Sequence, residues 1–289
     1  MEKTYRRSFS TYARLGFLDK SSGIDFGLDG KAVIVTGAAR GIGAAIARAF
    51  GLAHADVLLA DRMKRLDGRR RCESLAKEIV SAGRKARVVQ TDVSDYGQVE
   101  RMVETAASEF GWLDILVANA GVAKDKPALE IDEENWNENL TINAKGCLNC
   151  CRAAAKQMIR QGRGGKIVAI SSIDGIAAET GLLSYSASKA AVNMMVKCLA
   201  LELAPYRINV NGIAPGWVES EMSVGDLSAD RVDALRKALK ERVPLGYMAQ
   251  PGAIAGGALY LASPLSDYVT GQILVIDGGI LSNMTIKLP

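Results

Sequence analysis

Short apolar runs rich in β-branched residues recur along the chain, and longer amphipathic stretches separate them. The runs are apolar at nearly every position instead of at alternate positions, which is typical of strands in a parallel sheet covered on both faces. The pattern predicts seven strands, at residues 32–36, 57–60, 86–90, 115–118, 166–171, 208–213 and 273–276. It predicts helices at residues 42–52, 73–82, 96–110, 133–160, 186–203, 229–239 and 253–262.

Strands and helices alternate over residues 30–289 without an internal repeat or a linker-like shift in composition. This order indicates a single α/β domain, a doubly wound seven-stranded parallel sheet with helices on both faces. A ligand is then expected at the carboxyl ends of the strands. Residues 1–29 form a separate N-terminal arm, whose arginines and serines suit a targeting peptide but whose acidic residues do not. We favour a retained arm that packs on a neighbouring subunit over a cleaved one.

The composition is that of an ordinary globular protein. Of the 289 residues, 48% are hydrophobic and 24% are charged, and the net charge is only +4, which excludes a disordered, collagen-like or disulfide-rich chain. No run approaches the ~20 apolar residues that a membrane span needs, so we expect no membrane partner. The five cysteines are an odd number in a chain long enough to fold without disulfides, which favours the reducing cytoplasm.

Two clusters allow other interpretations. Cys147, Cys150 and Cys151 suggest a metal site, but they lie on one predicted helix and the single histidine, His54, is distant in sequence. A closed zinc site usually needs four ligands, so we expect core packing and no bound metal. Residues 62–71 hold six basic residues and one acidic residue. Because no second basic surface accompanies them, we favour a solvated segment near an anionic cofactor over a nucleic-acid site.

The first predicted strand runs directly into a helix through Thr-Gly-Ala-Ala-Arg-Gly-Ile-Gly at residues 36–43. Gly37, Gly41 and Gly43 allow the backbone to turn sharply and to approach a diphosphate closely. The start of the helix, at Ile42, offers unpaired N–H groups and a partial positive charge. The loop therefore predicts a dinucleotide-binding site.

Asp61 ends the second predicted strand, where a carboxylate can accept hydrogen bonds from the ribose hydroxyls of an adenosine. This acid would repel a 2′-phosphate, whereas Arg40 and Arg62 would attract one. We favour NAD over NADP as the cofactor and leave both open. The segments after the third and fourth strands reach the same edge and are expected to line the cofactor cleft, or else to be turn and cap residues: Asp92, Val93, Asn119, Ala120 and Gly121.

Tyr185 and Lys189 are four residues apart in a predicted helix and share one face of it. A phenol has a pKa of ~10, so acid–base work near neutral pH needs a shift of ~3 units, or ~4 kcal/mol. An ammonium ~4 Å away supplies an interaction of that order at an effective dielectric constant of ~20. The pair alone is common by chance, but Ser171 and Ser172 end the strand just upstream, and Asn143 precedes that strand.

With these motifs in this order, residues 28–279 resemble the short-chain dehydrogenase/reductase family. The family's glycine-rich loop, Asn-Ala-Gly segment, serine, Tyr-x3-Lys pair and Pro-Gly motif all occur here. The resemblance implies a Rossmann-like fold and a catalytic tetrad: Asn143, Ser172, Tyr185 and Lys189. Tyr185 would be the general acid or base, and Ser172 would hydrogen-bond the substrate oxygen. Lys189 would lower the pKa of Tyr185 and hold the nicotinamide ribose, and Asn143 would position a water. By spacing Ser172 fits the family pattern, and Ser171 is expected to be structural.

The resemblance also implies contacts after the sixth strand. Pro215, Gly216, Val218 and Ser220 would lie near the nicotinamide, with serine where the family more often has threonine. Residues 221–243 would form a lid over the substrate. The pocket would be bordered by Ser172, Asp174, Glu179, Tyr185 and Trp217, and its two acids hint at a sugar or polyol. Helices 133–160 and 186–203 would join subunits into a homotetramer.

The leading hypothesis is therefore an NAD(P)-dependent oxidoreductase, with NAD favoured, that acts on an alcohol or carbonyl substrate. One alternative is an NADP-dependent 3-oxoacyl thioester reductase. The other is a nucleotide-bound regulator without chemistry, which the complete tetrad disfavours.

Overall fold

The computed structural model describes residues 18–19, 23–24, 26–63, 66–225 and 227–283. Its main sheet has seven strands: β3 (Ala32–Thr36), β4 (Asp56–Asp61), β5 (Ala86–Gln90), β6 (Ile115–Ala118), β7 (Gly165–Ile170), β8 (Ile208–Pro215) and β9 (Ile273–Ile276). Their order is β5-β4-β3-β6-β7-β8-β9, and every neighbouring pair is parallel. The predicted doubly wound sheet is confirmed. A small antiparallel pair, β1 (Leu18–Asp19) and β2 (Gly23–Ile24), precedes it, and the remainder of the predicted arm up to residue 25 lies outside the described residues.

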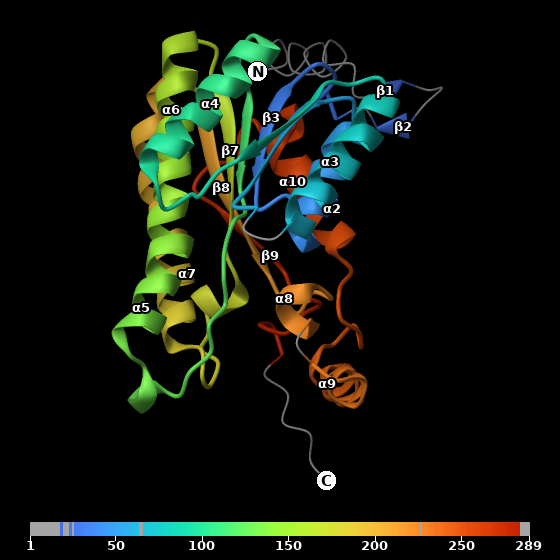
Figure 1. The fold of residues 1–289 in the computed structure, drawn as a ribbon, viewed down its shortest axis with the longest axis vertical. Coiled ribbons are helices and arrows are strands. Elements are labelled where there is room, and N and C mark those ends of the chain that lie inside the picture. The colour runs from blue at the N-terminus through green and yellow to red at the C-terminus, as the bar shows by residue number, and fades with distance from the viewer. Residues whose placement is uncertain (1–17, 20–22, 25, 64–65, 226, 284–289) are drawn as a thin grey trace, which may run out of the picture.

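Helices cover the sheet on both faces (Figure 1). One face carries α4 (Tyr96–Phe110), α6 (Gly146–Gln161) and α7 (Leu183–Leu203), and the other carries α2 (Gly41–Leu52), α3 (Leu66–Ser81) and α10 (Pro251–Ala262). Alternate strand residues feed the two cores: Ile34 and Leu58 pack with the first set of helices, Val33 and Val57 with the second. The central strands are apolar throughout because both of their faces are buried.

The carboxyl ends of the strands form the edge on which the sequence places its motifs. β3 and β6 are neighbours, although β4 and β5 lie between them in the chain, so the direction of winding reverses there. Loops diverge at such a switch point and leave a crevice. The short helices α5 (Glu133–Asn139), α8 (Glu221–Val224) and α9 (Ala229–Arg242) lie toward this end of the molecule (Figure 1).

The predicted helix at 133–160 is not continuous. Between α5 and α6 the chain forms a π-helical turn, Leu140–Lys145, which contains Asn143. A π turn widens the helix and is frequent at functional sites. The segment contains neither glycine nor proline, the residues that usually mark a break in a helix, so the sequence does not predict the π turn. α3 also begins earlier than predicted, where ion pairs one turn apart, Arg69–Glu73 and Arg71–Asp67, support its first turns.

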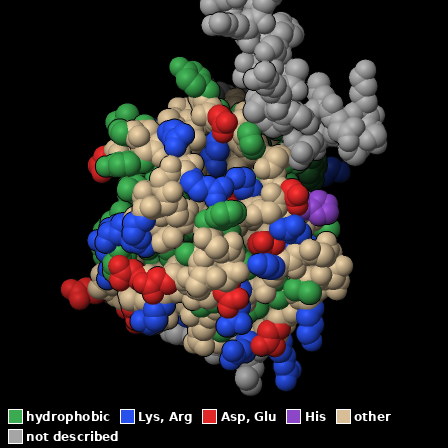
Figure 2. Space-filling model, turned by 90° about the horizontal axis from the view of Figure 1, so that it is seen from above, with side chains coloured by type: hydrophobic (Ala, Val, Ile, Leu, Met, Phe, Trp, Pro, Cys, Tyr) green, Lys and Arg blue, Asp and Glu red, His purple; other side chains and the backbone are tan. Residues whose placement is uncertain are grey.

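The cysteine cluster packs in the core. Cys147, Cys150 and Cys151 are buried against α4 and the sheet, and the Sγ atoms of Cys147 and Cys151 are 3.9 Å apart. Among the described residues, no group of three or more histidine, cysteine, aspartate or glutamate side chains is arranged so that it could hold a metal ion. None of the helices in the described ranges is long and apolar enough to cross a membrane. On the face in Figure 2, basic and acidic side chains are interspersed, as the small net charge suggests.

Candidate active site

The cofactor loop, residues 36–43, makes a tight turn between β3 and α2. Gly37 and Gly41 have φ angles of 67° and 55°, which residues with a side chain rarely adopt. A Cβ atom on Gly43 would overlap the carbonyl oxygen of Gly37. Within the described residues, Arg40 provides no side-chain cap and the first turn of α2 holds no acid. The N–H groups at this helix start therefore keep their positive charge for an anion.

Thr36 joins this loop to the segment after β6. Its Oγ1 accepts hydrogen bonds from the backbone N–H groups of Asn119 and Ala120, both at 3.0 Å. Asn119 Nδ2 donates to the carbonyl of Thr36 at 2.8 Å and lies 3.3 Å from the carbonyl oxygen of Gly37. Because β3 and β6 flank the switch point, these bonds fix the floor of the crevice.

Asp61 is held against the cofactor loop at the end of β4. Its Oδ2 accepts from the N–H of Ala39 at 3.1 Å and its Oδ1 from the N–H of Met63 at 3.2 Å. A carboxylate has further lone pairs, so it can still accept from ribose hydroxyls. A cradle that Cβ atoms would fill, a helix start without an acid and this carboxylate together fit an adenine dinucleotide.

Asp92 and Val93, after β5, support the loop itself. Ser94 donates its hydroxyl and its N–H to Asp92 Oδ1, at 2.6 and 3.0 Å. The carbonyl of Val93 accepts from Asn149 Nδ2 at 2.9 Å. These contacts favour the alternative in which Asp92 and Val93 stabilise the turn after β5 instead of lining the cofactor cleft. Arg62, which follows Asp61, is half-buried.

Gly121 lies where the tetrad meets the crevice. A Cβ atom on it would be 3.1 Å from Asn143 Oδ1 and 3.5 Å from Lys189 Nζ. Asn143 accepts from the N–H of Val122 at 2.8 Å and donates to its carbonyl at 2.9 Å. It also donates to Ser188 Oγ at 2.9 Å. Asn143, the one buried residue of the π turn, is therefore a fixed part of the wall and joins that turn to Val122 and to α7.

Ser172 and Tyr185 meet at the end of β7. Ser172 Oγ donates to Asp174 Oδ2 at 2.8 Å and accepts from the N–H of Asp174 at 3.1 Å. The same hydroxyl hydrogen-bonds the phenol of Tyr185, which is 9% exposed. Glu179 lies close by. Burial raises the pKa of its carboxyl, and the neighbouring charge of Asp174 raises it further. The structure thus brings both predicted catalytic groups and both predicted acids together.

Lys189 is buried beneath this group. Its Nζ donates to the carbonyl of Ile170, the last residue of β7, at 3.0 Å and lies 5.6 Å from the centre of the Tyr185 ring. Its own carbonyl accepts from Ser171 Oγ at 3.2 Å, which joins α7 to the sheet. Burial lowers the pKa of Lys189 to about 8.

The pKa of Tyr185 differs from the prediction. Burial raises it to about 12, the carboxylates of Asp174 and Glu179 add to the rise, and the bond to Ser172 offsets only part of it. The prediction assumed an ammonium ~4 Å from the phenol. In the structure the Lys189 ammonium is engaged by the carbonyl of Ile170, and burial of the phenol is the largest influence on its pKa. The expectation of a lowered pKa is therefore wrong for the chain alone, and the phenol is protonated at neutral pH.

The loop after β8 closes over the cofactor loop. A Cβ atom on Gly216 would come within 2.8 Å of Asp277 Cα, so the backbone there must pass close to the residue that follows β9. Val218 is buried. Ser220 is the N-cap of α8, and its Cβ lies 3.4 Å from the place where a Cβ on Gly41 would be. The start of α8 therefore lies beside the cofactor loop.

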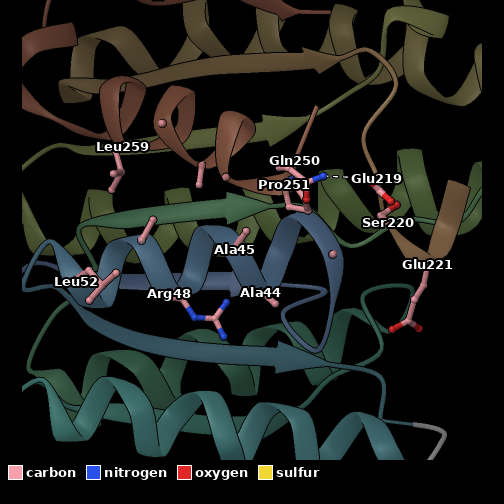
Figure 3. Close-up of a pocket in the computed structure, with 15 residues that line it drawn as sticks. Ala44, Ala45, Arg48, Leu52, Glu219, Ser220, Glu221, Gln250, Pro251 and Leu259 are labelled. Carbon is pink, nitrogen blue, oxygen red and sulfur yellow. Dashed lines mark hydrogen bonds between the residues drawn. The ribbon is translucent and has the colours of Figure 1, made fainter. Parts of the chain in front are cut away.

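Trp217 lies apart from the tetrad. It lines a cavity of about 310 Å³, and no tetrad residue lines that cavity, whose apolar walls include Val243, Leu245 and Tyr247. A larger groove, of about 720 Å³, runs between α2 and α10 (Figure 3). Glu219, Ser220 and Glu221, at the start of α8, form one end of this groove, and Leu52 and Leu259 line it farther along the two helices.

Comparison with known proteins decides the family. Residues 37–281 match the model of a family described as enoyl-(acyl carrier protein) reductase. The 3-oxoacyl-[acyl-carrier-protein] reductase FabG of Thermotoga maritima is 37% identical over 88% of this chain and 99% of its own. The L-rhamnose 1-dehydrogenase (NAD(P)(+)) of Azotobacter vinelandii is 36% identical over 88% and 98%. The chain belongs to the short-chain dehydrogenase/reductase family.

A solved structure agrees with this assignment. The gluconate 5-dehydrogenase of Burkholderia cenocepacia, in complex with NADP and tartrate, has a TM-score of 0.82 and 33% identity, covering 90% of this chain and 98% of that one. The expected fold and the expected reaction class, NAD(P)-dependent oxidoreduction, are confirmed. The roles of individual site residues stay predictions.

This short-chain dehydrogenase/reductase has site residues that carry no sequence motif. Asn139 is fully buried, and its Nδ2 lies 2.9 Å from Ser184 Oγ and 3.1 Å from the carbonyl of Lys124. Ser184 in turn donates to Asn135 Oδ1 at 2.6 Å. The side-chain amides of Asn135, Asn139 and Asn143 therefore hydrogen-bond the backbone of the segment after Gly121 and fix its path. The four-residue spacing is their only signal in the sequence.

Gly43→Ala should weaken dinucleotide binding by about tenfold or more, because the new methyl group overlaps a backbone carbonyl and the diphosphate cradle must open. Calorimetric titration with NAD and NADP measures the effect. Gly256→Ala is the matched control, since a Cβ there meets nothing within 4 Å. Unchanged binding by a folded Gly43→Ala protein would contradict the assignment of this loop.

Proposed function

We propose that this protein transfers a hydride between a nicotinamide dinucleotide, with NAD favoured, and an alcohol or carbonyl carbon, with Tyr185 as the proton donor or acceptor. The observation that supports this most is the contact of Ser172 with the Tyr185 phenol above a buried Lys189. When bound, the nicotinamide ring supplies or accepts the hydride. The chain itself positions the substrate oxygen and handles its proton.

Tyr185 is suited to donate a proton during carbonyl reduction, since its pKa of about 12 keeps it protonated at neutral pH. During alcohol oxidation it must accept the substrate proton, and the Lys189 ammonium below the ring then stabilises the phenolate. Ser172 Oγ bonds both Asp174 and the Tyr185 phenol, so a substrate oxygen that binds these two hydroxyls would replace the bond between them. Asn143 holds the wall beside Lys189.

A neutral polyhydroxyl substrate suits the acids beside Ser172. Asp174 and Glu179 can accept hydrogen bonds from neighbouring hydroxyls, whereas they would repel a carboxylate or phosphate. L-rhamnose, in the name of the Azotobacter vinelandii relative, is a neutral sugar of this kind, whereas gluconate, in the name of the Burkholderia cenocepacia enzyme, carries a carboxylate. Asp61, at the end of β4, supports NAD over NADP.

A second candidate is an NADP-dependent 3-oxoacyl thioester reductase, which the similarity to the Thermotoga maritima enzyme favours. A nucleotide-bound regulator without chemistry is disfavoured by the complete tetrad. We further propose a cytoplasmic homotetramer. Five free thiols suit a reducing compartment, and apolar side chains are exposed along the proposed contact helices α6 and α7, at Leu148, Ile159, Met194 and Leu201.

Tyr185→Phe should lower turnover by about 10²- to 10⁴-fold and leave NAD binding within about twofold, because the phenyl ring keeps the packing and loses only the proton. Absorbance at 340 nm follows NAD and NADP with sugars, polyols, secondary alcohols and hydroxyacyl thioesters. Tyr206→Phe, at an exposed tyrosine, is the control. Near-native turnover by Tyr185→Phe would refute the assigned role, and turnover with NADP and thioesters alone would favour the second candidate.

Asp174→Asn should raise the KM for a neutral polyol by about tenfold and lower that for a sugar acid, because one carboxylate beside Ser172 is lost. Steady-state rates on a matched pair of sugar and sugar acid measure this. Asp267→Asn, at a carboxylate bound to Lys166, is the control. A parallel change in both KM values would contradict a charge-based selection of substrate.

Light scattering at micromolar concentration should give the mass of four chains. Replacing Leu201, which is 80% exposed on α7, with Glu should dissociate the tetramer, since a charge would be buried in the contact. The exposed Leu129→Glu is the control, because it lies outside α6 and α7. A monomeric wild-type chain would refute the proposed assembly.

A further inference from the structure

Glu221, the first residue of α8 in the lid, binds two guanidinium groups from distant parts of the chain. Arg40, in the cofactor loop, donates from Nη1 to its Oε2 at 2.8 Å. Arg71, on α3, donates to its Oε1. Each carboxylate oxygen thus has its own arginine. Arg71 is additionally bound to Asp67 within α3, at 2.9 Å.

The two arginines lie near the place where the ribose of the adenosine is expected. Asp61 is tied by its Oδ2 to Ala39, the neighbour of Arg40, at 3.1 Å. A Cβ atom on Gly68 of α3 would be 3.9 Å from Ala39 Cβ, and Arg71 is one helical turn beyond Gly68. In Figure 3, Glu221 lies beyond the start of α2, at the same end of the groove as Ser220.

This arrangement matters for the choice between NAD and NADP. A guanidinium is the natural partner of a phosphate, and a 2′-phosphate near Asp61 would need such a partner. Here a carboxylate of the same chain already occupies two nearby guanidiniums, those of Arg40 and Arg71. The hydrogen bonds from Arg71 and Arg40 hold the pKa of Glu221 below its usual range, so it stays charged at neutral pH. NAD, with free ribose hydroxyls, does not compete for these arginines.

We propose that Glu221 is a specificity-determining residue that favours NAD by occupying Arg40 and Arg71 in place of a 2′-phosphate. The inference rests on the proposed function, in which a dinucleotide binds at the cofactor loop. NADP must displace or face the Glu221 carboxylate in addition to that of Asp61. Because Glu221 begins α8 and Ser220 touches the cofactor loop, the same contact links the lid to the adenosine end of the site.

The test compares nucleotide binding by the wild-type protein and Glu221→Gln. The side chain is exposed and the substitution keeps its shape, so the fold is expected to persist, and thermal unfolding checks it. Calorimetric titration gives Kd for NADP, NAD, 2′,5′-ADP and 5′-AMP. NADP and 2′,5′-ADP should bind about tenfold more tightly, the effect of one charge-assisted contact, while NAD and 5′-AMP change by less than about twofold.

Glu219→Gln is the matched control, since Glu219 lies in the same loop but binds Arg236 and Gln250 instead of the cofactor loop. It should leave the ratio of NADP to NAD affinity unchanged. Adding Arg40→Gln to Glu221→Gln should remove most of the gain. An unchanged ratio in Glu221→Gln, or an equal shift in Glu219→Gln, would overturn this inference while leaving the proposed function intact. A wild-type protein that binds none of the four nucleotides would overturn both.

Discussion

The hydrogen bond from the buried Lys189 ammonium to the carbonyl of Ile170 is the contact on which the site depends. An ammonium out of water is tolerated only where polar partners replace its hydration, so α7 must lie against the end of β7. That position carries Tyr185, one turn earlier on α7, to Ser172, two residues beyond the strand. It also leaves the nitrogen beside Gly121, which lacks the side chain that would cover it.

The wall opposite α7 is built by asparagines. Asn139 and Asn143 bind the backbone at Lys124 and Val122, and each also bonds a serine of α7. Side chains that grip a neighbouring segment constrain the helix that carries them, and the π turn lies within this stretch. The helix break, the path of residues 121–124 and the position of α7 are thus parts of one hydrogen-bonded unit.

Much of the fold could be predicted because buried parallel strands are apolar at every position, and the catalytic tetrad could be proposed because its residues fall in motifs that resemble those of a known family. The π turn could not, since residues 139–145 are an ordinary helical sequence. The contacts of Glu221 with Arg40 and Arg71 join residues 181 and 150 positions apart, which no pattern along the chain reveals. The pKa of Tyr185 was predicted wrongly because spacing gives the nearest charge but not the burial that outweighs it.

The lid meets the rest of the molecule through opposite charges at its two ends. Glu221 starts it with a carboxylate bound to Arg40 and Arg71. At the other end, burial and the charge of Asp174 raise the pKa of Glu179, and Arg242, the last residue of α9, offsets part of that rise. A neutral polyol and NAD would leave both interactions in place. A substrate carboxylate would compete with Glu179 for Arg242, and a 2′-phosphate would compete with Glu221 for its arginines. Under the proposed function, the segment from Glu221 to Arg242 would therefore select against extra negative charge on the substrate and on the cofactor.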